Sequence, residues 1–196
     1  MKIISVNVGI VAPLFVKAGS NSQTVHSAIR KQAITGKVAV RPLGLAGDEQ
    51  ADLSVHGGLD KAVYAYPSEH YAFWQAEAER VLKAPVTLSH GALGENLTTE
   101  GLLEHDLWVG DRLQAGELVL QVTEPRQPCF KFAARMGYAH AVKQMLQSGY
   151  SGVYLKVVQP ADVEAGTALR LIPGEREVSL ASINARRLKG RQRDLF

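Results

Sequence analysis

The stretch LWVGDRLQAGELVLQVT, residues 107–123, decides the fold. Two runs rich in strand-forming residues, LWVGDRLQ and LVLQVT, flank the short turn AGE, and this order is typical of a β-hairpin. Short runs of the same kind, separated by Gly, Pro and Asp, recur at residues 2–8, 37–40, 62–66, 152–158 and 167–172. Because few helices separate these runs, the sequence predicts a mainly β, α+β protein whose antiparallel strands close into a barrel.

Two other segments show helical spacing. In residues 71–82 the apolar side chains recur at 3.6-residue intervals on one face, and Ser68 is the expected N-cap. A second helical segment begins soon after Cys129, breaks at Gly137 and is expected to stop at Gly149. Core packing is the simplest explanation of both apolar faces, so these helices are predicted to be peripheral elements packed on the barrel.

Length and composition indicate one globular domain. The chain has 196 residues, of which 46% are hydrophobic and 21% charged. The strand pattern ends near Pro173, so we expect a barrel domain at residues 1–172 and a basic C-terminal tail at 173–196 that contains ARRLKGRQRD. The net charge of +3 and the pI near 9.0 favour an anionic small ligand over a nucleic acid.

The cysteine count and the N-terminus predict a cytoplasmic protein. A single cysteine excludes an internal disulfide and therefore a secreted disulfide scaffold. Asn7 and Pro13 interrupt the apolar run at the N-terminus, so we do not expect a signal peptide. No apolar run approaches the roughly 18 residues that a membrane span needs, and no membrane association is expected.

The common catalytic motifs are missing from the sequence. It contains no GxxxxGK[ST] loop, GxGxxG fingerprint, HExxH, CxxC or GxSxG. The six histidines are scattered without i, i+4 pairing, which disfavours a zinc site. What remains are three unusual stretches.

Two of the stretches are rich in glycine. Residues 44–67 contain His56 followed by Gly57 and Gly58, and such glycines let backbone N–H groups approach a ligand. Residues 91–102 contain Asn96, whose amide can both donate to and accept from the edge of a heterocycle. Each stretch is also explained by a turn, the first joining two strands and the second carrying an Asn that caps itself.

The third stretch is EPRQPCFKF, residues 124–132. Pro125 and Pro128 make the segment stiff, and Cys129 follows where it passes into a helix. A thiol near a helix N-terminus, with Arg126 close by, is biased toward thiolate, the form that binds soft metals. The alternative is a buried cysteine that packs as a small hydrophobe.

The three stretches in this order resemble the MOSC domain, named for the C-terminal part of molybdenum cofactor sulfurases, and within it the stand-alone YiiM-like branch. The matching residues are GDEQADLSVHGGLDKAVYAYP, then GENLTTEGL, then VGDRLQAGELVLQVTEPRQPCFK, and the likeness extends from residue 1 to about 172. It implies a strongly bent β-barrel that binds the molybdenum cofactor, a phosphate-bearing pterin dithiolene, with Cys129 as the molybdenum ligand. Relatives in this branch often carry a three-helix extension, and VSLASINARRLKGRQRDLF resembles its beginning.

The implied reaction is the reduction of N-hydroxylated compounds, such as 6-hydroxylaminopurine and amidoximes, in a detoxification role. A separate flavoprotein reductase would supply the electrons, and a homodimer is kept open. The residues expected to act in catalysis are Cys129, His56 and Glu49, with Glu124 as an alternative proton donor. The residues expected to bind the cofactor are Arg30, Lys31, Gly57, Gly58, Asn96, Arg126 and Gln127.

Two other functions remain open from the sequence. The chain could bind or deliver the cofactor, or a sulfur-loaded form of it, without turnover, with Cys129 carrying persulfide sulfur. It could also be a Cys–His hydrolase with Cys129 as nucleophile and His56 as base, although no local signal supports an oxyanion hole.

Overall fold

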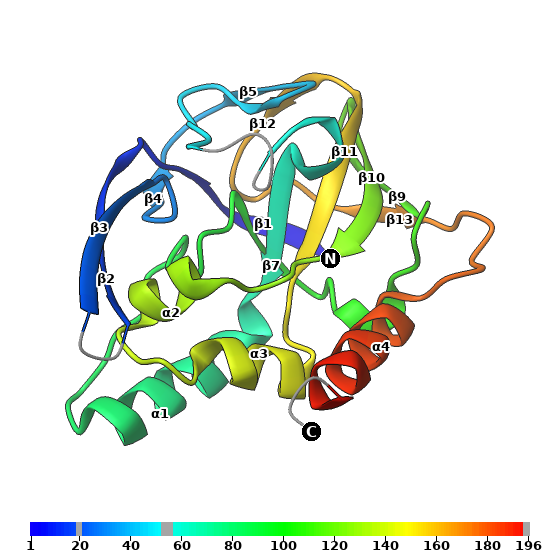
Figure 1. Ribbon diagram of the computed structural model, residues 1–196. Coiled ribbons are helices and arrows are strands. Elements are labelled where there is room, and N and C mark those ends of the chain that lie inside the picture. The colour runs from blue at the N-terminus through cyan, green and yellow to red at the C-terminus, as the bar shows by residue number, and fades with distance from the viewer. Residues whose placement is uncertain (19–20, 52–56, 194–196) are drawn as a thin grey trace.

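The computed structural model describes residues 1–18, 21–51 and 57–193. Its main element is an eight-stranded sheet that curls into a partial barrel (Figure 1). The order of the strands in this sheet is β13 (Arg170–Ile172), β9 (Arg112–Ala115), β10 (Leu118–Pro125), β11 (Val153–Gln159), β7 (Val63–Pro67), β8 (Leu97–Glu100), β1 (Lys2–Val8) and β4 (Gln32–Ile34). The predicted mainly β fold with a bent sheet is confirmed.

One pair of neighbouring strands departs from the expected antiparallel order. β7 and β8 are parallel, whereas the other neighbours in the main sheet are antiparallel. The chain between them forms a short 3-10 helix, Ser68–His70, and the helix α1, Tyr71–Leu82. Parallel strands need such a crossover connection, so the first predicted helix is what makes this pairing feasible.

Two smaller sheets complete the strands. One has the order β12 (Ala161–Val163), β5 (Val38–Arg41) and β6 (Gly44–Leu45). The other is the hairpin of β2 (Ala12–Ala18) and β3 (Asn21–Ser27), which projects at the left of Figure 1 beside a helix that follows Cys129. This hairpin was not predicted from the sequence, because the residues of β3 are mostly polar, although Gly19-Ser20 between the two runs is a typical hairpin turn signal.

The hairpin predicted from residues 107–123 is present but begins later than expected. Its strands β9 and β10 pair Ala115 with Leu118 across a two-residue turn, and Gly116 in that turn has a φ of +61°. Before β9, the side chain of Asp111 accepts hydrogen bonds from Trp108 N at 3.1 Å and Gly174 N at 2.7 Å. These bonds fold residues 107–111 into a turn, and the strand therefore starts only at Arg112.

The helices confirm most of the predicted boundaries. They are α1, α2 (Phe130–Met136), α3 (Ala141–Ser148) and α4 (Leu180–Arg193), with further 3-10 turns at Leu59–Lys61 and Glu104–Asp106. Gly137 and Gly149 end α2 and α3 with φ of +81° and +73°, as expected for left-handed C-caps. The expectation for Ser68 is wrong: it begins the 3-10 turn, and His70 is the N-cap of α1.

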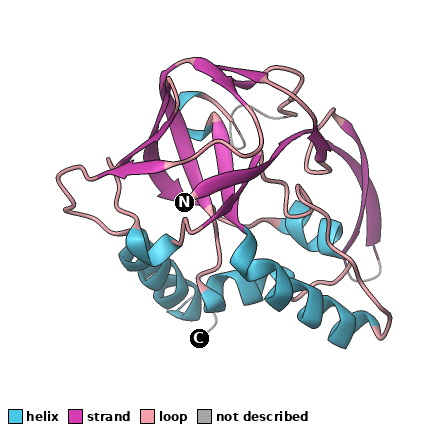
Figure 2. Ribbon diagram, turned by 180° about the vertical axis from the view of Figure 1, so that it is seen from behind, coloured by secondary structure: helices cyan, strands magenta, loops and turns pink. Residues whose placement is uncertain are grey.

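A second apolar core holds the helices against the sheet. The barrel interior is filled mainly by Val, Leu and Ile, whereas this second cluster contains Tyr66, Trp74 and Phe132, each with an exposed fraction of 0%. Figure 2 shows the helices gathered along one side of the strands. Phe132 of α2 contacts Trp74 of α1 edge to face at 5.3 Å between ring centres. This packing fixes α2, whose first residue directly follows Cys129.

Candidate functional site

An open cavity lies where the hairpin, the sheet and α2 meet. Its wall contains four cationic side chains, two carboxylates and one thiol. The residues that line it are Ser27, Ala28, Ile29, Lys31, Asp48, Glu49, Gln50, Ala51, Lys61, Tyr64, Gly94, Asn96, Arg126, Cys129, Lys131 and Tyr154. These residues come from widely separated parts of the chain, so the cavity exists only in the folded protein.

Cys129 lies on the cavity wall at the start of α2. It is the N-cap of this helix, with extended backbone angles (φ −127°, ψ 178°), and it is half-buried. Its carbonyl oxygen accepts a hydrogen bond from Phe132 N at 2.9 Å, which closes the first turn. The predicted position, at the passage from a stiff segment into a helix, is confirmed, and the thiol is not sealed in apolar core.

Arg126 provides a buried cation three residues before the thiol. Its exposed fraction is 7%, and its NH1 donates to Leu93 O at 2.5 Å. The guanidinium lies over the rings of Tyr64 at 4.8 Å and Phe132 at 5.1 Å. Burial alone lowers the pKa of Arg126, but Tyr64, Tyr154 and Cys129 raise it, and the net shift is upward. The group therefore stays a fixed positive charge beside Cys129.

Lys31 and Asp48 form a buried ion pair in the cavity wall. Their Nζ and Oδ1 atoms are 2.5 Å apart, and their side chains are 8% and 4% exposed. The same Oδ1 accepts a hydrogen bond from Gly9 N at 2.8 Å, and Oδ2 accepts one from Asn96 Nδ2 at 2.8 Å. Burial lowers the pKa of Lys31, while Asp48 acts in the opposite direction. The Asp48 carboxylate thus links its own loop to three other segments at the site.

Asn96 is held by the protein on both ends of its amide. Besides the bond to Asp48, its Oδ1 accepts a hydrogen bond from Tyr64 N at 3.1 Å, and Nδ2 also approaches Asn7 O at 3.4 Å. It lines the cavity, and its hydrogen-bonding groups are occupied by these protein partners. Its evident role is to align β7 with the loop before β8.

Glu95 supports the loop from which Asn96 projects. Its side chain accepts hydrogen bonds from Gly91 N at 2.8 Å, Leu93 N at 3.1 Å and Thr98 Oγ1 at 2.8 Å, and also from Tyr71 OH. Glu95 has an exposed fraction of 0%. Because Leu93 in this loop accepts the bond from Arg126, this buried carboxylate also determines where the cation lies.

The structure brings together five of the residues predicted for the site. Lys31, Glu49, Asn96, Arg126 and Cys129 all line the cavity. Glu49 is exposed, and its carboxylate accepts a hydrogen bond from Val11 N at 2.6 Å. His56 lies outside the described residues.

Four further predicted residues are described but do not line this cavity. They are Arg30, Gly57, Gly58 and Gln127. Arg30 is exposed. Burial of Arg135 lowers the pKa of that residue, and the positive charge of Arg30 lowers it further. Gly57 and Gly58 have φ of +155° and +83°, so the chain turn before the 3-10 helix explains the glycine pair. Gln127 is exposed.

Sequence reasoning did not assign site roles to Asp48, Lys61, Tyr64 and Tyr154. The rings of Tyr64 and Tyr154 are tilted by 46° with their centres 5.3 Å apart, and burial raises the pKa of each phenol. Both tyrosines lie within strand-forming runs, where an aromatic residue is common and gives no sign of a site. In the sequence, Asp48 is one of several acidic residues in the glycine-rich stretch 44–67, and nothing distinguishes it from the others.

The described part of the chain contains no cluster of three or more His, Cys, Asp or Glu that could hold a metal ion. Nor does any helix within residues 1–18, 21–51 and 57–193 have the length and apolar character needed to cross a membrane.

Comparisons with known proteins agree on one family. The family model of the MOSC domain matches residues 52–170. The chain is 40% identical over 165 residues to the uncharacterized protein YflK of Bacillus subtilis, covering 84% of this chain and 72% of YflK. It is 34% identical over 158 residues to a protein of Gibberella moniliformis named Reductase, covering 80% of this chain and 28% of that protein. The crystal structure of YiiM from Geobacillus stearothermophilus superimposes with a TM-score of 0.73 at 35% identity, covering 97% of this chain and 85% of that chain.

Proposed function

Since the chain belongs to the MOSC domain family, we propose that it is a molybdenum-cofactor-binding oxidoreductase that reduces N-hydroxylated compounds, such as hydroxylaminopurines and amidoximes. The observation that carries this proposal is the position of Cys129, the single cysteine, on the wall of a cavity that also contains Lys31, Lys61, Arg126 and Lys131. The relative named Reductase supports an oxidoreductase.

The residues present fit the molybdenum cofactor. Molybdenum held by dithiolene sulfurs takes one more soft anionic ligand, and Cys129 can supply it. The cofactor carries a phosphate, and cationic side chains outnumber carboxylates on the wall. Asp48 is already paired with Lys31, which leaves Glu49 as the remaining acidic group among the described lining residues.

The chemistry divides between the cofactor and the chain. The cofactor, when bound, supplies the metal centre that passes two electrons to the substrate. Reduction of an N-hydroxylated compound consumes two electrons and two protons and releases the amine or amidine and water. Glu49 lies on the wall in contact with solvent, so it can carry protons into the cavity. Arg126 contributes a fixed positive charge, and the buried Lys31–Asp48 pair keeps the surrounding segments in place.

Glu124 is a poor proton donor in this arrangement. Its carboxylate is shared between two cations, Lys61 at 3.3 Å and Arg187 at 2.6 Å. Glu124 is also absent from the residues that line the cavity, so it is not placed to pass a proton directly to a ligand there. Among the carboxylates suggested by the sequence, Glu49 is therefore preferred.

The test uses protein made in a host that synthesises the molybdenum cofactor. We expect the purified chain to contain molybdenum and pterin in equal amounts, and to reduce benzamidoxime or 6-hydroxylaminopurine with reduced methyl viologen as electron donor. Cys129→Ser should abolish turnover while the thermal unfolding temperature stays close to that of the wild type. Full activity of Cys129→Ser would refute the proposal.

The same experiment separates the second function. Protein that retains the cofactor but reduces none of these substrates, and that passes sulfur to an acceptor protein, would be a carrier. The flavoprotein electron donor, the cytoplasmic location and a homodimer remain predictions.

A further inference from the structure

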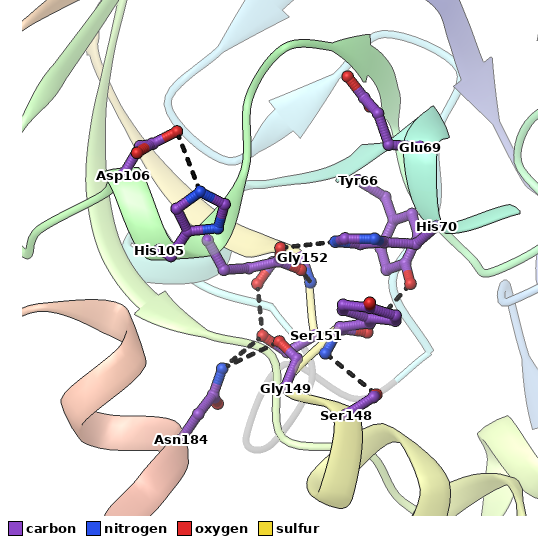
Figure 3. A network of polar contacts seen from close by, with 12 residues as sticks. Tyr66, Glu69, His70, His105, Asp106, Ser148, Gly149, Ser151, Gly152 and Asn184 are labelled. Carbon is purple, nitrogen blue, oxygen red and sulfur yellow. Dashed lines mark hydrogen bonds and ion pairs between the residues drawn. The ribbon is translucent and has the colours of Figure 1, made fainter. Parts of the chain in front are cut away.

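The C-terminal helix α4 contacts the rest of the molecule through one face. Leu180, Asn184 and Arg187 lie at i, i+4 and i+7 along the helix, and Leu180 is fully buried in the main core. Asn184 Nδ2 donates to Gly149 O at 3.2 Å and to Ser151 Oγ at 3.1 Å, as Figure 3 shows from close by. The basic segment that the sequence suggested to be a tail is therefore docked on the barrel along this face.

Arg187 binds the end of the strand that leads to the thiol. Its NH1 donates to Pro125 O at 2.6 Å, and its NH2 to Glu124 Oε2 at 2.6 Å. The other oxygen of Glu124 lies 3.3 Å from Lys61 Nζ on the cavity wall. The Arg187 side chain is only 21% exposed, so these charge-assisted bonds are partly shielded from water.

The stiffness of the next residues carries this constraint to the cavity. Pro125 ends β10, and Pro128 immediately precedes Cys129, so few backbone torsions are free between the two. Fixing the carbonyl of Pro125 therefore fixes the origin of the whole segment. We propose that Arg187 is a positioning residue for Cys129, which makes α4 a structural part of the site.

Arg187 differs in this respect from its neighbour on the same helix. Arg186 is exposed, and the one contact that its side chain makes to a described residue is a 3.4 Å bond to Ser182 O within α4. Arg186 therefore provides a matched control of equal charge. The inference rests on the proposed function only in taking Cys129 as the working thiol, and its test requires no turnover.

The test measures how fast Cys129 reacts with iodoacetamide. The full chain is made in a host that lacks molybdenum cofactor synthesis, and alkylation of its single cysteine is followed by mass spectrometry. We expect Cys129 to react about fivefold faster in Arg187→Gln. The reason is that the segment around Cys129 opens locally before it reacts, and losing the net strength of about one hydrogen bond raises the equilibrium constant of this opening about fivefold. Arg187→Lys keeps a cation for Glu124 and should give an intermediate rate. Arg186→Gln should react at the wild-type rate.

Two further variants distinguish positioning from loss of helix docking. Asn184→Ala loosens α4 at the corner formed by residues 149–152 but leaves the bonds of Arg187 intact. It should alter the alkylation rate of Cys129 by less than about twofold. Glu124→Gln removes the negative charge that holds the Arg187 guanidinium next to Pro125 O, so it should also accelerate alkylation. It replaces Arg187→Gln if that variant does not fold. Equal acceleration by Asn184→Ala, or a wild-type rate in Arg187→Gln and Glu124→Gln, would overturn the proposal.

Discussion

The buried pair of Lys31 and Asp48 should make the stability of the protein sensitive to a single amide substitution. In Asp48→Asn the side-chain oxygen can still accept from Gly9 N and Lys31, but the new amide nitrogen faces Asn96 Nδ2, and two donors then meet. The ammonium of Lys31 also loses its counter-charge at a site where the two side chains are 8% and 4% exposed. Breaking a buried pair from one side costs about 3 kcal/mol or more in the free energy of unfolding.

The loss should depend on pH in a defined direction. Burial lowers the pKa of Lys31 below its ordinary 10.5, and Asp48 opposes this shift, so the substitution lowers the pKa further. Between the folded-state pKa and 10.5 the unfolded chain binds more protons than the folded chain, and stability rises with pH across this window. The window is wider in Asp48→Asn. Its deficit relative to the wild type is therefore largest near neutral pH and shrinks as the pH approaches 10.5.

The assay is urea unfolding at pH 7 and pH 9.5, followed by tryptophan fluorescence. The control is Asp162→Asn, which removes an exposed carboxylate 3.9 Å from Arg41, with side chains 53% and 59% exposed. That surface pair should contribute less than about 1 kcal/mol. If Asp48→Asn loses no more stability than this control, or if its deficit grows with pH, the reasoning about a buried ammonium is wrong.

Three other substitutions test the packing around the site. Glu104→Ala deprives His70 Nε2 and Gly152 N of the carboxylate that they approach at 2.8 and 2.6 Å, and should cost about 3 kcal/mol in urea unfolding. Gly152→Ala places a methyl group 2.6 Å from a backbone oxygen at a φ of +63°, so it should destabilise clearly more than Gly166→Ala, which adds about 1 kcal/mol of backbone strain in open space. Arg126→Met leaves a buried carbonyl without its donor and should lower both the unfolding temperature and the molybdenum content of the purified protein.

The parts of the fold that the sequence predicted are those with local signals. The strand-forming runs of β1 and β10 and the helix stops at Gly137 and Gly149 depend on neighbouring residues, and the structure confirms them. Cys129 was found for the same reason, since proline and helix onset mark its position within a few residues. The parallel pairing of β7 with β8 depends on the path that the chain takes through α1 from one strand to the next. No short stretch of sequence shows this path.

The polar contacts of the site follow the same rule. Lys31 and Asp48 are 17 residues apart, Asp48 and Asn96 are 48 apart, and Glu124 and Arg187 are 63 apart. The sequence around a charged loop residue is the same whether its side chain is exposed to solvent or buried in an ion pair in the folded protein. For this reason nothing in the sequence indicated that Lys31 pairs with Asp48 or that Arg187 binds Glu124.

The geometry of the cations narrows the choice of residue for an anionic ligand. The ammonium of Lys31 is committed to Asp48, and that of Lys61 is drawn toward Glu124. Lys131 is half-buried and has no hydrogen bond or ion pair to another residue in the part of the chain that the structure describes. Arg126 keeps further N–H donors after its bond to Leu93 O. Both flank Cys129 in the sequence and line the cavity, so an anionic ligand held through the thiol would find Arg126 and Lys131 available as cationic partners.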